Sequence, residues 1–169
     1  LSMDQRQGVF ISHIGEEKAI ALRLQALLKQ ALAPGTPIFV SSDYRSIEGG
    51  DRWYEAILGG LKRSRVVIAL LSPVSLDRRW INFEAGIGMG QGSRVIPVAI
   101  RGLAKSEIGQ PLGQLQAREI SHEADLKALL EDVAAACLLN VKLQGAASFA
   151  ADLASIEAQL PSTGLHVSI

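Results

Sequence analysis

The feature that most constrains the fold is an uninterrupted apolar run at residues 66–71, which ends in Ser72-Pro73. Apolar residues without polar alternation are typical of a strand that is covered on both faces of a sheet. We therefore predict a buried strand over residues 65–71. Further short apolar runs predict strands at residues 8–12, 38–40 and 94–100, and a brief fifth strand at residues 117–120. Pro97 predicts an edge position or a strand end for the fourth of these strands.

Apolar residues at helical spacing lie between these strands. Ile20, Leu24, Leu27 and Ala31 predict an amphipathic helix over residues 16–33. A short helix is predicted at residues 53–61, stopped by two consecutive glycines, and another from about Leu76. The stripe from Leu126 to Leu138 predicts a further helix, and Phe149, Leu153, Ile156 and Leu160 predict one more.

Strands that alternate with helices indicate βαβ units and a parallel sheet. We therefore predict an α/β, flavodoxin-like fold, with roughly five parallel strands and helices on both faces. Residues 8–139 form the predicted domain, and residues 140–169 form a C-terminal helical extension that packs back on it or contacts another chain.

Composition restricts the partners and the compartment. Seventeen basic and seventeen acidic residues cancel, which argues against direct nucleic-acid or membrane-surface binding. The sequence shows no apolar run long enough to span a membrane and no signal peptide, and its single cysteine, Cys137, fits a reducing compartment. We expect a cytoplasmic location. Leu1 and Ser2 precede Met3, which leaves open that the chain is one domain of a longer protein.

The strongest candidate for chemistry is the pair Trp80 and Glu84. The two residues are four positions apart, so they share one face of the helix that follows the buried strand. Open α/β sheets bind ligands at the carboxyl ends of their strands, which is where this face is expected to lie. The alternative is that Glu84 is a helix-surface carboxylate paired with Arg78, Arg79 or Arg94.

Four segments together resemble the TIR (Toll/interleukin-1 receptor) domain family, of the bacterial NAD-cleaving type. They are Val9-Phe10-Ile11-Ser12-His13, Phe39-Val40-Ser41-Ser42-Asp43 with Ile47 and Gly49, the stretch from Ile57 to Ser72, and Trp80-x-x-x-Glu84. The resemblance covers roughly residues 8–139. Two positions depart from the family pattern. His13-Ile14 replaces the usual Tyr-Arg, and Glu48-Gly49-Gly50 replaces the usual Pro-Gly of the loop after the second strand.

The resemblance implies cleavage of the nicotinamide–ribose bond of NAD+, with Glu84 as the catalytic carboxylate. It also implies NAD+ contacts from Ser12, His13, Asp43, Arg45, Ser72 and Trp80. Nicotinamide leaves as a neutral amine, so one carboxylate that stabilises the ribosyl cation is sufficient, whereas glycosidases need a second group to protonate the leaving oxygen. NAD+ is the substrate, and neither a cofactor nor a metal is implied.

Several of these residues have structural alternatives. Ser12 and His13 are alternatively loop caps, and Asp43 a turn former. Trp53 is predicted as a residue of core or helix packing. Ser75 is predicted as a helix N-cap. The glycines at positions 86, 88, 90 and 92 resemble a phosphate loop, but no strand directly precedes them and no Lys-Ser/Thr follows, so we interpret them as close helix packing or a helix end.

Three functions follow as hypotheses. The first is an NAD+ glycohydrolase or cyclase that acts in bacterial antiphage defence or in modulation of a host. It releases nicotinamide and ADP-ribose or a cyclic ADP-ribose isomer. The second is a non-catalytic adaptor that assembles with other TIR domains through the loop at residues 47–51. The third is a nucleoside deoxyribosyltransferase-like enzyme. Activity in this family usually requires several aligned TIR domains, and a fused or separate sensor is a further expected partner.

Overall fold

The computed structural model describes residues 5–41 and 50–162. In this part of the chain, parallel strands form a five-stranded sheet in the order β2-β1-β3-β4-β5. The strands are β1 (Gly8–Ser12), β2 (Ile38–Val40), β3 (Ser64–Leu71), β4 (Arg94–Ala99) and β5 (Arg118–Glu119). This arrangement confirms the predicted α/β fold, because 2-1-3-4-5 is the flavodoxin-like strand order.

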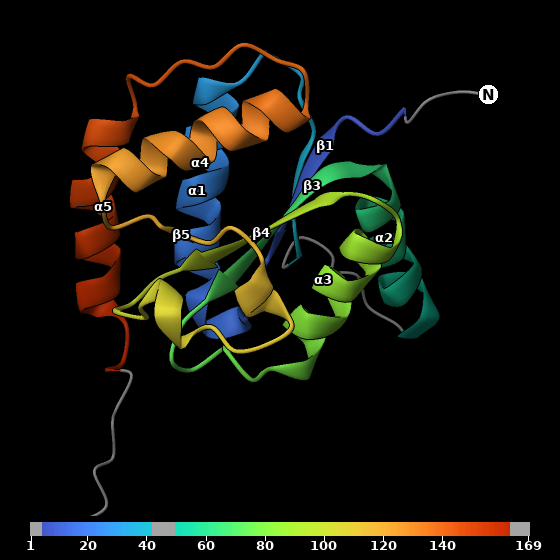
Figure 1. Ribbon diagram of the computed structural model, residues 1–169, viewed down its shortest axis with the longest axis horizontal. Helices are drawn as coiled ribbons and strands as arrows, with labels where there is room; N and C mark the ends of the chain where they lie inside the picture. The colour runs from blue at the N-terminus through green and yellow to red at the C-terminus, as the bar shows by residue number, and fades with distance from the viewer. Residues whose placement is uncertain (1–4, 42–49, 163–169) are drawn as a thin grey trace, which may run out of the picture.

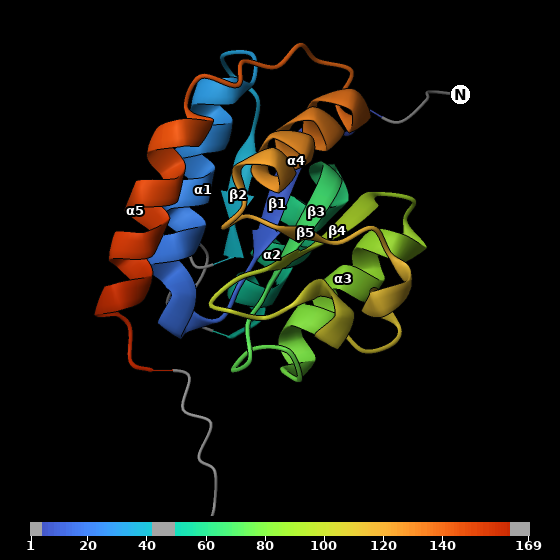
Figure 2. The same ribbon diagram turned by 60° about the vertical axis from the view of Figure 1, so that its left-hand side comes forward.

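Helices cover both faces of the sheet (Figures 1 and 2). α1 (Lys18–Ala31), α4 (Glu123–Ala136) and α5 (Ala146–Gln159) lie on one face, while α2 (Gly50–Arg63) and α3 (Arg79–Gly90) lie on the other. The short 3-10 turns η1 (Gly15–Glu17), η3 (Lys105–Glu107) and η4 (Leu112–Gln114) belong to the connections.

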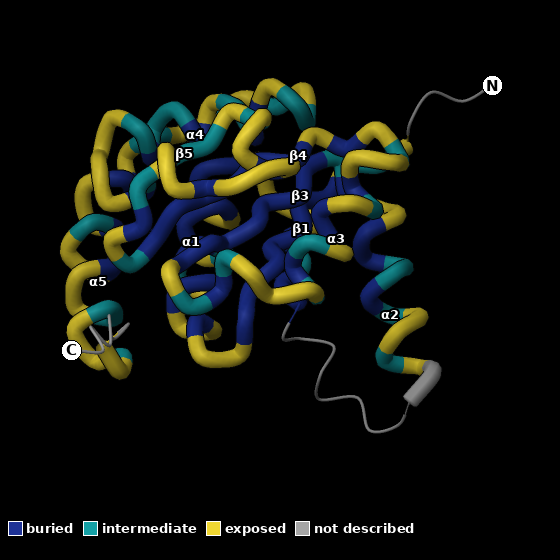
Figure 3. Tube along the Cα trace, turned by 60° about the horizontal axis from the view of Figure 1, so that its bottom comes forward, coloured by how far each residue is buried: buried dark blue, intermediate teal, exposed yellow. Residues whose placement is uncertain are grey.

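β3 forms the centre of the core. Every residue of β3 from Val66 to Leu71 is fully buried, as Figure 3 shows along the tube. Alternate residues point to opposite faces of a strand. Val66, Ile68 and Leu70 therefore pack toward α1, α4 and α5, whereas Val67, Ala69 and Leu71 pack toward α2 and α3.

α2 does not stop at Gly59 and Gly60, so that prediction is wrong. The helix continues to Arg63. Ile57 and Leu61 lie on either side of the glycine pair and are both 0% exposed. Burial of such side chains gains about 1.5–3 kcal/mol each, which outweighs a cost of about 1 kcal/mol for each glycine in a helix.

Pro97 does not mark an edge strand, because β4 lies between β3 and β5. Pro97 pairs in register with Ala69 of β3. The ladder to β5 begins only at Val98 and Ala99. Pro97 therefore lies in the part of β4 that precedes the pairing with β5. On the side away from β3, no described strand pairs with this part, so the missing N–H of proline is tolerated.

α5 forms an additional layer on the outside of α1 (Figure 2). Phe149 and Leu153 are 0% and 2% exposed, and they join the same core as α1 and α4. An ion pair between Arg23 Nε and Asp152 Oδ2 at 2.8 Å links α1 to α5 across their exposed sides.

The glycine series in α3 serves close packing and a helix end, as interpreted from the sequence. A Cβ at Gly88 would lie 2.8 Å from Val67 Cγ2 and 3.1 Å from Val95 Cγ2, so the helix backbone sits directly on the sheet there. Gly92 follows the helix end with φ +84°, a conformation that side chains disfavour. These contacts fix the height of α3 above the sheet.

Candidate functional site

The candidate site lies at the carboxyl edge of the sheet, between β1 and β3. In a sheet of this order the connections after β1 and β3 leave on opposite faces, which creates a crevice that often binds ligands. Ser12 and His13 end β1, Ser41 follows β2, and Ser72 follows β3. All four residues are 0% exposed. The fold therefore gathers three of the predicted contact residues, Ser12, His13 and Ser72, at one edge.

His13 is held by backbone contacts. Its backbone N–H donates to Ser41 Oγ at 3.3 Å, and its Nδ1 lies 2.6 Å from the carbonyl oxygen of Ile14. Because a carbonyl oxygen only accepts, the second contact requires the proton on Nδ1. Ser12 Oγ is buried and makes no hydrogen bond with any described residue. Its hydroxyl is therefore available to a ligand that reaches this edge.

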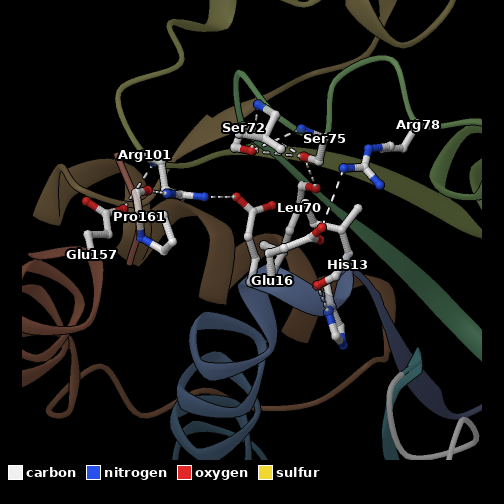
Figure 4. Close-up of polar contacts among 12 residues, drawn as sticks. His13, Glu16, Leu70, Ser72, Ser75, Arg78, Arg101, Glu157 and Pro161 are labelled. Atoms are coloured by element: carbon white, nitrogen blue, oxygen red, sulfur yellow. Dashed lines mark hydrogen bonds and ion pairs between the residues drawn. The ribbon is translucent and has the colours of Figure 1, made fainter. Parts of the chain in front are cut away.

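Ser72 and Ser75 form a turn instead of a helix start. The Ser72 N–H donates to Ser75 Oγ at 2.8 Å, and the Ser75 N–H donates to Ser72 Oγ at 3.1 Å. Figure 4 shows this exchange at the end of β3. The predicted N-cap role of Ser75 is therefore wrong, because α3 begins at Arg79 and not near Leu76. The two hydroxyls end β3 and set the direction in which the chain enters α3.

Trp80 belongs to an aromatic cluster formed by α2 and α3. Its ring stacks on Trp53 with centroids 5.0 Å apart, and it meets Phe83 at 5.3 Å and Tyr54 at 6.5 Å. Trp53 is therefore a packing residue, as predicted from the sequence. Tyr54 and Phe83 are each 41% exposed, so the cluster reaches the surface. The indole N–H of Trp80 is buried and makes no hydrogen bond with a described residue.

Glu84 lies one turn after Trp80 and is 0% exposed. The other buried residues of α3 are Ile81, Ala85 and Gly88, so Glu84 occupies the side of the helix that faces the sheet. The surface alternative for Glu84 is therefore wrong. Arg78 pairs instead with Glu16, and Arg94 pairs with Asp132. A fully buried carboxylate is costly, which is why such groups concentrate at functional sites.

An open cavity of about 600 Å³ lies beside this edge. Its lining consists of Ile14, Gly15, Glu16, Arg78, Arg79 and Trp80. Trp80 thus connects the cavity to the helix that carries Glu84, although Glu84 itself is not part of the lining. Glu16, Arg78 and Arg79 were not predicted as ligand contacts, because charged residues in a loop and at a helix start are usually solvated.

A second buried glutamate stands at the same edge. Glu17 Oε2 accepts from Arg101 Nη1 at 3.1 Å, with side chains that are 0% and 7% exposed. Arg101 also donates to the carbonyl oxygen of Pro161, and its backbone N–H donates to Glu157 Oε1 at 3.1 Å (Figure 4). These contacts attach the end of α5 to the carboxyl end of β4. The pair was not predicted, since its members are 84 positions apart and neither has a local motif.

Asp43 and Arg45 lie outside the described residues, as do residues 47–49 of the proposed assembly loop. Among the described residues, no group of three or more His, Cys, Asp and Glu side chains is arranged to hold a metal ion. No helix in the described part of the chain has the length and apolar character needed to cross a membrane.

Comparisons with known proteins agree with this architecture. A solved structure titled "Structure of a metazoan TIR-STING receptor from C. gigas" matches with a TM-score of 0.52 at 18% sequence identity. The match covers 81% of this chain and 42% of the receptor chain, and at this identity it shows the fold alone. No curated protein sequence matches the chain.

The sequence model of the TIR domain matches residues 9–131, which is well over half of the chain. The matched segment runs from β1 into α4 and includes Trp80, Glu84 and all of the sheet except Gly8. The chain therefore belongs to the TIR domain family.

Proposed function

We propose that this TIR domain cleaves the nicotinamide–ribose bond of NAD+, with Glu84 as the catalytic carboxylate. The observation that supports this most is the complete burial of Glu84 on the sheet-facing side of α3, one turn from an aromatic cluster. Keeping a carboxylate there costs stability, and chemistry is a reason to retain it.

The proposed reaction needs one anionic group. The bond between the ribose C1′ and the pyridinium nitrogen breaks, and its electron pair neutralises the departing nicotinamide. Positive charge grows on the ribose, and Glu84 stabilises it either electrostatically or by a transient bond to C1′. Water, or a nucleophilic atom of the same nucleotide, then completes the reaction to ADP-ribose or a cyclic isomer. A low-dielectric surrounding strengthens this stabilisation, which favours a buried carboxylate.

Ser12, His13, Asp43, Arg45, Ser72 and Trp80 remain the proposed contacts to NAD+. Of these, Trp80 lines the cavity of about 600 Å³, and Ser12 has a buried hydroxyl with no hydrogen bond to a described residue. The Ser72 hydroxyl already forms hydrogen bonds with Ser75 in the turn after β3. Its contribution to the structure of this turn is therefore larger than its contribution to NAD+ binding.

Access to Glu84 must open before a ribose can reach it, because the side chain is 0% exposed. TIR domains generally self-associate, and we propose that assembly through the loop at residues 47–51 supplies this rearrangement. A fused or separate sensor would then control assembly, in a bacterial antiphage response within the cytoplasm. The C. gigas protein is titled a TIR-STING receptor, so in that protein TIR is named together with a second part.

A non-catalytic adaptor is the second candidate. The observation that favours it is the exposed aromatic surface formed by Tyr54 and Phe83, which would suit a protein contact, together with a carboxylate that the cavity does not reach. Membership of the TIR family removes the ground for a deoxyribosyltransferase.

The test is nicotinamide release from NAD+, measured by chromatography at high protein concentration with a crowding agent. Wild type, Glu84→Ala and a control variant, Glu131→Ala, are compared. Glu131 is an exposed glutamate of α4 on the other face of the sheet. We expect release from wild type and Glu131→Ala, with loss in Glu84→Ala. Assembly confirmed by light scattering, with no release from any variant, would support the adaptor instead.

A further inference from the structure

The cavity beside Trp80 has two arginines at adjacent positions. Arg78 and Arg79 both line it, and Glu16 is the acidic residue among its described lining residues. We propose that these arginines bind the pyrophosphate of a dinucleotide in this cavity, and that Glu16 opposes the binding by pairing with Arg78. The proposal rests on NAD+ as the substrate and adds the part of the site that holds its phosphates.

The two arginines differ in their present contacts. Arg78 Nη2 lies 3.5 Å from Glu16 Oε1, with side chains that are 49% and 55% exposed (Figure 4). Exposed ion pairs of this kind contribute little to stability, so a phosphate can displace the carboxylate from Arg78. Arg79 is exposed and forms no ion pair with any described residue. The cavity therefore holds one available guanidinium and one that a competing anion can release.

The start of α3 adds positive potential at the same place. Helical backbone begins at Arg79, and the side chain of the N-cap residue Arg78 makes no capping hydrogen bond. The first N–H groups of a helix carry partial positive charge that favours anions. Guanidinium groups bind phosphate oxygens with paired hydrogen bonds. The arginines and the helix start thus act in the same direction on an anion in the cavity.

The remaining lining suits a nucleotide better than a free anion. Trp80 provides an aromatic surface and Ile14 an apolar one, within a volume of about 600 Å³. Cavities that hold small ligands typically measure about 300–1,000 Å³. A phosphate pair bound by Arg78 and Arg79 would place the attached sugars next to Trp80, and Trp80 leads to Glu84 along α3.

The test measures binding without turnover. ADP-ribose, which has the pyrophosphate but no nicotinamide, is titrated into the whole chain by calorimetry. We expect Arg79→Gln to weaken binding about tenfold, the scale of one lost charge-assisted hydrogen bond. Arg78→Gln should weaken it less, and Glu16→Gln should strengthen it severalfold because it frees Arg78. Arg94→Gln is the control and should leave the affinity for ADP-ribose unchanged, because Arg94 lies at the amino end of β4 and the cavity lies at the carboxyl edge of the sheet.

Opposite signs for Arg79→Gln and Glu16→Gln are the outcome that general destabilisation cannot produce. Equal affinity in wild type and Arg79→Gln, or weaker binding by Glu16→Gln, would overturn the proposal. Inorganic pyrophosphate and adenosine serve as separate probes, and only the former should respond to Arg79→Gln. If both respond equally, the arginines do not act on phosphate.

The result also separates this proposal from the proposed function. Arginine-dependent binding of ADP-ribose without any nicotinamide release would retain the phosphate site and reject the enzyme. Nicotinamide release with binding that ignores Arg78, Arg79 and Glu16 would retain the enzyme and reject the phosphate site.

Discussion

The apolar core between the sheet and α1, α4 and α5 is large and continuous, whereas the core between the sheet and α2 and α3 is smaller. Glu84 lies on the buried side of α3, together with the apolar residues that α3 contributes to the smaller core. Among the described residues, each half also holds one glutamate that is 0% exposed. Glu17 is bound to Arg101 in a contact that also attaches α5, which is a structural use of charge. Glu84 lies one turn from an aromatic cluster that reaches the surface.

This difference suggests that the two sides of the sheet have different roles, one in stability and one in chemistry. Packing on the α1 side maintains the sheet, and the geometry on the α3 side positions the groups proposed for chemistry. Substitutions on the α1 side should therefore affect stability and leave turnover per folded molecule unchanged. Substitutions on the α3 side should affect turnover more than their cost in stability explains.

Phe149→Ala should give the largest loss of stability. Phe149 is 0% exposed in the core between α5, α1 and α4. Truncation of a buried phenylalanine costs about 3–5 kcal/mol because it leaves a cavity. Urea unfolding measures the loss, and Leu138→Ala is the control, since Leu138 is 81% exposed and should change stability by less than about 0.5 kcal/mol. Reduced turnover of the folded Phe149→Ala protein would contradict the different roles of the two sides.

Gly88→Ala should have a smaller effect on stability and a clear effect on turnover. The new Cβ would lie 2.8 Å from Val67 Cγ2, so α3 must move away from the sheet. Overpacking of this kind costs about 1–3 kcal/mol. The movement of α3 also displaces Glu84, which lies one helical turn before Gly88. Gly86→Ala is the matched control, because its Cβ meets nothing within 4 Å.

In the Gly86→Ala control, the loss of backbone freedom should stabilise the helix by about 0.5–1 kcal/mol. Comparison of nicotinamide release by the two alanine variants checks the prediction. Equal turnover in both would show that the height of α3 above the sheet does not matter to function.

Alkylation of Cys137 should give the smallest effect. Burial raises the pKa of this thiol, and the nearby Arg65 only partly opposes the rise. The thiolate fraction near neutral pH is therefore below that of a free cysteine, and iodoacetamide should react severalfold more slowly. The rate should increase as pH rises toward the raised pKa. Labelled protein should retain full turnover, because Cys137 lies at the end of α4; a loss of turnover on labelling would contradict the different roles of the two sides.

Local sequence was sufficient for the strands. The predicted runs at Gly8–Ser12 and Ile38–Val40 coincide with β1 and β2, because apolar residues are bounded there by polar residues or proline. Helix ends were less predictable. Serines near the end of β3 form a turn with each other, so the usual N-cap signal appears at least four positions before α3 begins. In α2, packing of Ile57 and Leu61 overrides the glycine pair.

The site was predictable only where it depends on helix periodicity. The spacing of Trp80 and Glu84 placed both residues on one helix, as observed. The stacking of Trp80 on Trp53 and the pairing of Glu17 with Arg101 join distant segments, and their geometry follows from tertiary packing that no local pattern encodes. For the same reason the sequence left open whether Glu84 is exposed or buried.

The measurement that tests the account most directly is turnover and stability of Glu84→Gln in one preparation. We expect nicotinamide release to fall by at least about 100-fold, the scale of removing one preorganised group that stabilises developing charge. The free energy of unfolding should stay the same or increase, because a neutral amide costs less to bury than a carboxylate. Full turnover in Glu84→Gln, or a loss of stability of about 3–5 kcal/mol, would contradict this account and assign Glu84 a structural role like that of Glu17.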